Sequence, residues 1–202
     1  MQKKTVIKSA GFTTEELRGI AALHRKSISG GFLADANVGL LELLYSYIAQ
    51  EPSCVLVGAF IDGRTSGFVS GTLNTKKFFM GFVKRHLFRA GLMLAPRFVS
   101  PSFFKKVFEI LQYPFKISKT NEVNAELLSM AVAEEFQGQG IAQPMFEAFV
   151  HELKDHGGTS FKIIAGCGLG RANSFYKKMG AKTINTVEVH GGAKSQVYIY
   201  NV

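Results

Sequence analysis

The first half of the chain alternates apolar and polar positions in patterns that predict a strand, two helices and a β-hairpin. Their expected ranges, in order, are Thr5–Ser9, about 14–28, Asn37 to about Ala49, and Cys54–Ile61 with Thr65–Leu73. Thr13 and Glu16 form a capping-box sequence that marks the start of the first helix. Asp62-Gly63, between the two apolar runs, is typical of a tight hairpin turn.

The second half predicts strands alternating with helices. We expect a strand from Glu126 to Val132, a helix to about Asp155, a strand at Phe161–Ala165, a helix at about 171–179, and strands at Lys182–Val189 and Gln196–Asn201 around Gly191-Gly192. Between the halves, Phe79, Phe82 and Val83 lead on to His86 at helical spacing, and Ser100-Pro101 is typical of a helix start. This order predicts one α+β domain over 1–202, with a mixed sheet and a helical insert at about 74–121.

The most informative stretch joins the apolar run Leu127–Val132 to the amphipathic segment that follows it. The connection reads Gln137-Gly138-Gln139-Gly140-Ile141-Ala142. A strand, a glycine-containing turn and a helix aim several backbone N–H groups at one point, which favours a phosphate or diphosphate site. Gly138 and Gly140 have no Cβ, so a ligand can approach the main chain closely. The alternative is a tight turn that only packs the helix on the strand.

Two known phosphate loops do not match this connection. The Walker loop needs Gly-Lys-Ser/Thr at the helix start, and the dinucleotide fingerprint needs a third glycine where Gln143 stands. The pattern Gln/Arg-x-x-Gly-x-Gly/Ala is met by Gln137, Gly140 and Ala142. Downstream, the run from Ala172 to Ala181 is similar to Ala-x-x-x-Tyr-x-x-x-Gly-Phe. On these two patterns the chain resembles the GNAT superfamily of acyl-coenzyme A-dependent N-acyltransferases.

The resemblance covers about 122–182, is plausible from the N-terminus onward, and is absent over 74–121. Two positions depart from the family pattern. Leu169 stands where the second pattern usually has Asn, and Ala181 replaces the usual Phe. Both changes lie outside the phosphate loop and leave Tyr176 in place, but they weaken any detailed account of coenzyme contacts near 169–173.

The resemblance implies a mixed, mostly antiparallel sheet flanked by helices, whose fourth and fifth strands splay apart. The pantetheine arm of acetyl-coenzyme A would enter between them and hydrogen-bond like an added strand. A β-bulge on the fourth strand would leave N–H and C=O groups free for the arm, whereas the alternative is an ordinary buried central strand. The implied coenzyme-binding residues are Met130, Ala131, Val132, Gln137, Gly138, Gln139, Gly140, Ile141, Ala142 and Asn173. No metal is expected.

Acyl transfer to an amine requires loss of the amine's proton, stabilisation of an oxyanion and neutralisation of the leaving thiolate. The resemblance makes Tyr176 the candidate acid, because a phenol with a pKa near ~10 stays protonated at neutral pH. The alternative for Tyr176 is a plain core aromatic. A backbone N–H of Met130 or Ala131 would polarise the thioester carbonyl.

The general base is less well defined by the sequence. Glu126 begins the fourth strand and could draw the proton through one or two waters, a role that the family often gives a carboxylate there. The alternative is a solvated charge at the strand end. We interpret His190 as a bystander beside the Gly191-Gly192 turn, and Glu134 with Glu135 as solvated.

Composition and cysteines point to a globular protein of the cytoplasm. Apolar residues make up 47% of the chain, and no apolar run reaches the ~18–20 residues of a membrane span. The N-terminus has no apolar region of signal-peptide type. Cys54 and Cys167 match neither a disulfide framework nor a metal site, so we interpret both as buried thiols in a reducing compartment.

The whole excess positive charge lies in the insert. Residues 76–119 hold ten Lys/Arg and one acid, Glu109, which accounts for the net charge of +9. Ten aromatic residues accompany these cations. Three interpretations stay open: a helical cover over the acceptor site, a lid that meets an anionic or nucleotide-linked acceptor, and peripheral contact with an anionic membrane. Nucleic acid is disfavoured because no nucleic-acid module is present.

The sequence therefore predicts an N-acetyltransferase that moves an acetyl group directly from acetyl-coenzyme A to a primary amine of a small molecule, such as an amino sugar. The alternative from another class is a non-catalytic module that binds acyl-coenzyme A, or that associates with a membrane surface. The identity of the acceptor, the acyl chain length and the oligomeric state are not defined by the sequence.

Overall fold

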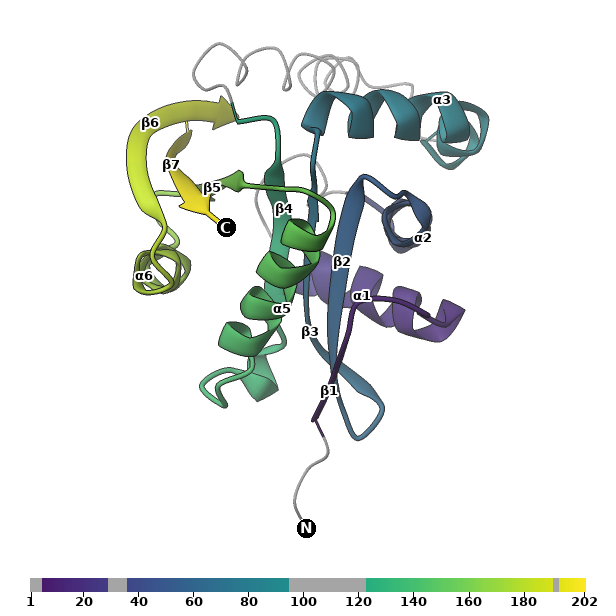
Figure 1. Ribbon diagram of the computed structural model, residues 1–202. Coiled ribbons are helices and arrows are strands. Elements are labelled where there is room, and N and C mark those ends of the chain that lie inside the picture. Colours follow the sequence, from purple (N-terminus) through teal and green to yellow (C-terminus); the bar gives the residue numbers. More distant parts are fainter. Residues whose placement is uncertain (1–4, 29–35, 95–122, 191–192) are drawn as a thin grey trace.

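The computed structural model describes residues 5–28, 36–94, 123–190 and 193–202, and at 87–94, 189, 190 and 193 only the backbone is considered. A seven-stranded sheet forms its centre, in the order β1-β2-β3-β4-β5-β7-β6 (Figure 1). Among the described strands, only β4 and β5 pair in parallel. The strands are β1 (Thr5–Lys8), β2 (Cys54–Ile61), β3 (Arg64–Thr72), β4 (Glu126–Val132), β5 (Ser160–Gly166), β6 (Lys182–His190) and β7 (Ala193–Asn201).

The helices lie where the apolar periodicity predicted them. They are α1 (Thr14–Ser27), α2 (Val38–Gln50), α3 (Thr75–Leu94), α5 (Ala142–Asp155) and α6 (Gly170–Lys178), with a short 3-10 turn, η3, at Glu134–Phe136. The α+β fold with a mixed, mostly antiparallel sheet is thereby confirmed. The hairpin turn is also confirmed, since Asp62 and Gly63 both have positive φ between β2 and β3.

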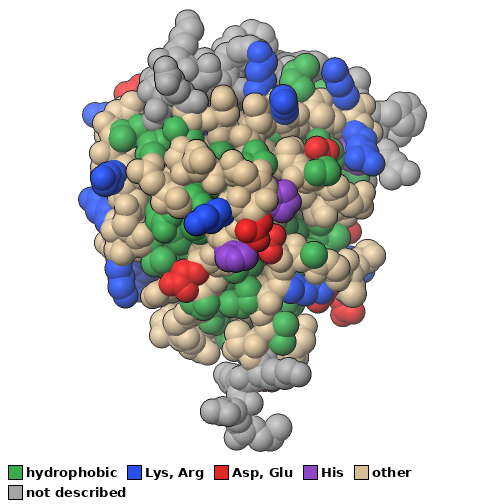
Figure 2. Space-filling view, in the orientation of Figure 1, with side chains coloured by type: hydrophobic (Ala, Val, Ile, Leu, Met, Phe, Trp, Pro, Cys, Tyr) green, Lys and Arg blue, Asp and Glu red, His purple; other side chains and the backbone are tan. Residues whose placement is uncertain are grey.

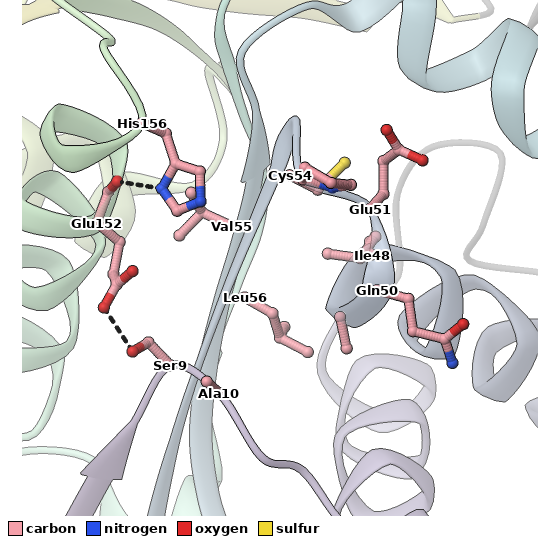
Figure 3. A pocket seen from close by; sticks show the side chains of 12 residues that line it. Ser9, Ala10, Ile48, Gln50, Glu51, Cys54, Val55, Leu56, Glu152 and His156 are labelled. Carbon is pink, nitrogen blue, oxygen red and sulfur yellow. Dashed lines mark hydrogen bonds between the residues drawn. The ribbon is translucent and has the colours of Figure 1, made fainter.

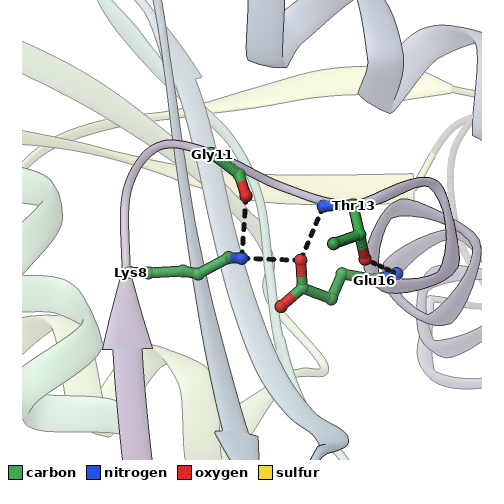
Figure 4. A network of polar contacts seen from close by, with 4 residues as sticks. All are labelled: Lys8, Gly11, Thr13 and Glu16. Carbon is green, nitrogen blue, oxygen red and sulfur yellow. Dashed lines mark hydrogen bonds and ion pairs between the residues drawn. The ribbon is translucent and has the colours of Figure 1, made fainter.

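The start of α1 shows how local sequence fixes an element. The Thr13 hydroxyl accepts the Glu16 N–H at 3.2 Å, and the Glu16 carboxylate accepts the Thr13 N–H at 2.7 Å, so the capping box is complete. Lys8 at the end of β1 donates to the same carboxylate at 2.6 Å and to the carbonyl of Gly11 at 3.0 Å (Figure 4). One side chain therefore ties the first strand to the first helix.

Helices cover both faces of the sheet. Because side chains alternate along each strand, neighbouring residues of β3 face different helices. Phe68 of β3 faces α1 and α2, where it contacts the rings of His24 and Tyr45. Gly71 of β3 faces α5, and a Cβ there would lie 2.5 Å from the Phe149 ring. The missing side chain therefore lets α5 pack closely against the middle of the sheet (Figure 1).

Helix α3 begins the insert and packs against α2. Phe78, Phe82 and His86 contact the ring of Tyr47 on α2. The opposite side of α3 is exposed and cationic, and Figure 2 shows Lys and Arg side chains gathered over it; the described ones are Lys76, Lys77, Lys84 and Arg85. The helix predicted from Ser100-Pro101, together with Arg97 and the four lysines that follow it, lies outside the described residues.

The expectation of two buried thiols is half wrong. Cys54 is buried in β2, but Cys167 is exposed. The reason is that β5 ends at Gly166, so Cys167 opens the connection to α6 and no longer belongs to a packed strand. None of the helices in the described ranges is long and apolar enough to cross a membrane.

Candidate active site

Strands β4 and β5 separate soon after they begin. They pair only through Glu126 with Lys162 and Leu127 with Ile163. Beyond Leu127, β4 continues to Val132 with β3 on one side and none of the described strands on the other. Leu127 is buried, whereas residues 128–132 are partly exposed. The expected splaying is present, and among the described residues it leaves this edge of β4 without a strand partner for its backbone groups.

A bulge lies on β4 close to the predicted place. Ser70 of β3 pairs with Ser129 and Gly71 pairs with Leu127, so Leu128 is an extra residue on β4. A bulge bends its strand and interrupts the ladder. It lies two residues before Met130, at the point where β4 turns away from β5.

The loop after β4 has the geometry of an anion site. Gly138 and Gly140 have φ of 76° and 77°, and a Cβ at either position would meet nothing within 4 Å. Helix α5 begins at Ala142 without a side-chain cap. Within the described part of the chain, the N–H groups of residues 138–143 have no backbone acceptor, and Pro144 has no N–H. Several exposed donors and a helix N-terminus therefore face solvent together.

A contact that the sequence did not predict joins this loop to α6. The Arg171 guanidinium donates to the Gln137 side-chain oxygen, with 3.1 Å between Nη1 and Oε1. The Gln137 amide nitrogen donates in turn to the carbonyl of Val132, at 3.2 Å. The chain of contacts runs from the end of β4 to the helix that follows β5, so a cation lies beside the glycine loop. No sequence signal joins two exposed residues on separate elements.

The two carboxylates before the loop are exposed, as expected for solvated residues. Glu135 lies 3.6 Å from the Arg64 guanidinium at the start of β3. Its charge is therefore partly balanced by a cation on the neighbouring strand. This pair reduces the repulsion that Glu135 would exert on a phosphate in the loop.

The other end of β4 is closed by a buried ion pair. Glu126 and Lys162 are each 3% exposed, and the Lys162 Nζ lies 3.5 Å from Glu126 Oε2. The same oxygen accepts the Thr75 hydroxyl at 2.9 Å, from the first residue of α3. The alternative of a solvated strand-end charge is therefore wrong for Glu126, because α3 and Lys162 cover its carboxylate.

Tyr176 lies on α6 and is 6% exposed. Its ring contacts those of Phe146, Phe175 and Tyr198. Burial raises the pKa of its hydroxyl above the ordinary value of 10, with a further contribution from Tyr198. The phenol stays protonated at all physiological pH values, which suits a hydrogen-bond donor to a thiolate better than it suits complete proton transfer.

Asn173, expected to contact the coenzyme, is committed to the protein. Its amide nitrogen donates to the carbonyl of Gly166 at 2.9 Å, and its amide oxygen accepts the Tyr198 hydroxyl at 2.8 Å. These bonds tie the start of α6 to the end of β5 and to β7. Asn173 thereby holds in place the helix that carries Tyr176 and Arg171.

A buried polar network reaches the middle of β4 from the opposite face. Nδ1 of His24 lies 2.6 Å from the Tyr45 hydroxyl, which also hydrogen-bonds the Ser70 and Ser129 side chains. His24 is 1% exposed and its Nε2 has no partner. Burial lowers the pKa of His24 from its ordinary 6.5 to about 4, so the imidazole is neutral near pH 7. The side chain of His190, which the sequence led us to interpret as a bystander, is not among those described.

A hollow of about 200 Å³ among the described residues lies away from the loop. Its walls include Ser9, Gln50 and Glu51, together with Glu152 and His156 near the C-terminal end of α5 (Figure 3). The Ser9 hydroxyl donates to Glu152 at 2.5 Å, and His156 Nδ1 contacts the Glu152 carbonyl at 2.7 Å. Because these polar groups satisfy one another and the glycine loop is at the other end of α5, we place the site at the loop.

In the described ranges no three His, Cys, Asp or Glu side chains lie together as a metal site would need. The predicted coenzyme-binding residues other than Asn173 lie along β4 and its loop. Met130, Ala131 and Val132 lie on the unpaired edge, and residues 137–142 form the glycine loop at its end.

Comparison with known proteins agrees with this geometry. Residues 116–198 match the family described as "Acetyltransferase (GNAT) domain". Over these residues the chain is similar to that family. No curated protein sequence matches the chain.

Solved structures of similar fold cover nearly the whole chain. SsHAT aligns with a TM-score of 0.67 and 16% identity over 98% of this chain and 98% of that one. NAA60 from Arabidopsis thaliana, solved in complex with acetyl-CoA, aligns with a TM-score of 0.60 and 12% identity over 98% and 99%. The ribosomal-protein-S18-alanine N-acetyltransferase from Escherichia coli aligns with a TM-score of 0.59 and 11% identity over 98% and 94%. At these identities the likeness shows the fold.

Proposed function

We propose that this protein transfers an acetyl group from acetyl-coenzyme A directly to a primary amine of a small molecule, such as an amino sugar. The observation that carries the proposal is the combination of a splayed β4–β5 pair with a glycine loop whose N–H groups are unpaired. The first offers backbone groups to a pantetheine arm, and the second offers donors to a diphosphate. The family match supports the same assignment.

In this proposal the arm lies along Met130, Ala131 and Val132, and the diphosphate lies on residues 137–142. A backbone N–H of Met130 or Ala131, next to the bulge, polarises the thioester carbonyl. Tyr176 donates a hydrogen bond to the thiolate as it leaves. Asn173 holds the start of α6 against β5, so that Tyr176 is correctly placed.

Glu126 receives the proton of the amine through water in this proposal. Its position on β4, before the bulge, puts it at the end of the strand away from the diphosphate loop. Its Oε2 lies 3.5 Å from the Lys162 Nζ and accepts the Thr75 hydroxyl. The nearby α3 carries exposed cations, which would suit an acceptor with an anionic group.

Two measurements test the proposal. Calorimetry should detect binding of coenzyme A and acetyl-coenzyme A, and thiol release should rise when the right amine is added. The amine panel should include amino sugars, nucleotide-linked amino sugars, polyamines and peptides with free N-termini. Thiol release that no amine increases would favour a non-catalytic acyl-coenzyme A-binding module. Activity confined to peptides would retain the transferase and overturn the small-molecule acceptor.

We also propose that the protein acts in the cytoplasm, either free or with α3 in contact with an anionic membrane surface. Sedimentation with vesicles that contain anionic lipid, compared with neutral vesicles, separates the two possibilities. Binding to the anionic vesicles that disappears at high salt would support the membrane contact.

A further inference from the structure

One cationic residue at the candidate site, Arg171, has not yet been given a function. Arg171 is exposed on the first turn of α6, and its guanidinium is held 3.1 Å from the oxygen of the Gln137 side chain. That bond joins a charged donor to a neutral amide in contact with solvent, so the charge of the guanidinium is not balanced by this partner. A charged partner would hold the guanidinium more strongly.

The place of Arg171 in its helix also suggests a missing anion. A helix N-terminus carries partial positive charge, so a cation in the first turn is unfavourable by itself. The first turn of α6 has no acidic residue, and its N-cap, Leu169, provides no side-chain cap. In the described part of the chain no carboxylate pairs with Arg171. The guanidinium is therefore available to a ligand that carries negative charge.

The anionic ligand closest to Arg171 would be the diphosphate that we assign to the glycine loop. Gln137 belongs to that loop and is anchored on the end of β4, whereas Arg171 comes from the helix after β5. Their bond thus joins the two sides of the separated strands at the end where the loop lies. A diphosphate on the N–H groups of residues 138–143 would be next to the oxygen that Arg171 now contacts.

We propose that Arg171 binds the coenzyme's diphosphate, and that it exchanges Gln137 for a phosphate oxygen when the coenzyme binds. This inference rests on the proposed function of the loop. Arg171 would add a charged side chain from α6, the helix after β5, to a site that otherwise consists of backbone donors. The planar guanidinium can donate two parallel bonds to one phosphate group, which an ammonium cannot do.

The test is calorimetry on the full chain with coenzyme A, dephospho-coenzyme A and pantetheine. Replacing Arg171→Gln should weaken coenzyme A and dephospho-coenzyme A equally, by about 10- to 100-fold, as expected for one charged hydrogen-bonded contact. Pantetheine, which has no phosphate, should bind both proteins alike. Arg171→Lys should recover part of the loss. Lys177→Gln, with the same charge change later in α6, should bind as the wild type does.

Three results would overturn the proposal. An unchanged affinity of Arg171→Gln for both nucleotides would remove Arg171 from the site. A loss for coenzyme A alone would assign Arg171 to the 3′-phosphate instead of the diphosphate. An equal loss for pantetheine would indicate a disturbed fold, which the thermal midpoint would also show. If the wild type itself does not bind coenzyme A, the proposed function fails before this question arises.

Salt gives an independent reading. Raising the ionic strength screens an exposed charge–phosphate contact. The affinity of the wild type for dephospho-coenzyme A should therefore fall more steeply with salt than that of Arg171→Gln. Parallel salt dependences would contradict a direct contact between Arg171 and phosphate.

Discussion

The two ends of β4 differ in burial and in the pairing of their polar groups. At its start, Glu126 and Lys162 are buried, and the carboxylate is covered by Thr75. Beyond its end, residues 137–140 are exposed, and in the part of the chain that the structure describes the N–H groups of residues 138–143 have no backbone acceptor. The closed end satisfies its polar groups within the protein, whereas the open end leaves them for a ligand. We therefore expect substitutions at the closed end to change stability, in addition to any effect of Glu126 on catalysis, and those at the open end to change binding.

The largest effect is expected at the closed end. Glu126→Gln leaves the Lys162 ammonium buried without its carboxylate, which should lower the free energy of unfolding by about 3–5 kcal/mol. Urea unfolding measures this change. The double variant Glu126→Gln with Lys162→Met should recover much of the loss, since no unpaired charge remains buried. As a control, Glu135→Gln at the exposed pair with Arg64 should stay within about 1 kcal/mol of the wild type.

A loss of activity in Glu126→Gln can be interpreted only together with the free energies of unfolding of the single and double variants. If the double variant folds as stably as the wild type but transfers no acetyl group, the loss belongs to catalysis. Full activity in the stable double variant would remove Glu126 from the role of base. Equal midpoints for wild type and Glu126→Gln would show that the ion pair does not hold the strands together.

At the open end, Gly140→Asp should separate binding from stability. The position is exposed with open space around it, so the fold should survive, although its φ of 77° favours glycine. The new carboxylate would repel the diphosphate, and coenzyme affinity should fall by at least about 100-fold, the equivalent of roughly 2.7 kcal/mol. Gly140→Asn has nearly the same shape without the charge and should lose much less. An equal loss in both variants would point to loop shape instead of charge.

The role proposed for Tyr176 is tested by removing its hydroxyl alone. Tyr176→Phe keeps the packing against Phe146 and Phe175 but removes the hydroxyl. Turnover should fall by about 10- to 100-fold, the worth of one hydrogen bond to a charged group, with coenzyme affinity unchanged. Tyr200→Phe, on β7 with its ring also against Phe146, should not change turnover. Undiminished turnover in Tyr176→Phe over the usable pH range would exclude the tyrosine from the mechanism.

The middle of β4 is tested by pH. In the folded protein the pKa of His24 is lowered to about 4, below the 6.5 of an exposed histidine, so protonation favours the unfolded chain. The stability tied to neutral His24 is complete above pH 6.5 and is lost as the pH falls toward 4. Between pH 7 and pH 5 the loss should be roughly 2 kcal/mol. His24→Gln, which keeps a polar partner for Tyr45, should show a flatter dependence; identical curves would contradict this assignment.

Much of the fold could be predicted because its signals are local. The capping box at Thr13 and Glu16 and the Asp62-Gly63 turn act within four residues, and the observed elements follow. The glycine loop is equally local, since strand, turn and helix succeed one another from 126 to 155. What failed concerned surroundings: Cys167 is exposed, and Glu126 is enclosed where a solvated charge was the alternative.

The order of residues by itself determined the strands, the helices and the loop whose amides turn outward, since backbone geometry and short-range periodicity act between neighbours in the chain. Only the tertiary structure decided which side chains meet across that frame. Glu126 lies beside Lys162 because the register of β4 and β5 pairs them. Arg171 contacts Gln137 because α6 packs with its first turn beside the glycine loop. Such partners are 36 and 34 positions apart and share no periodic pattern, so their contact follows from packing alone.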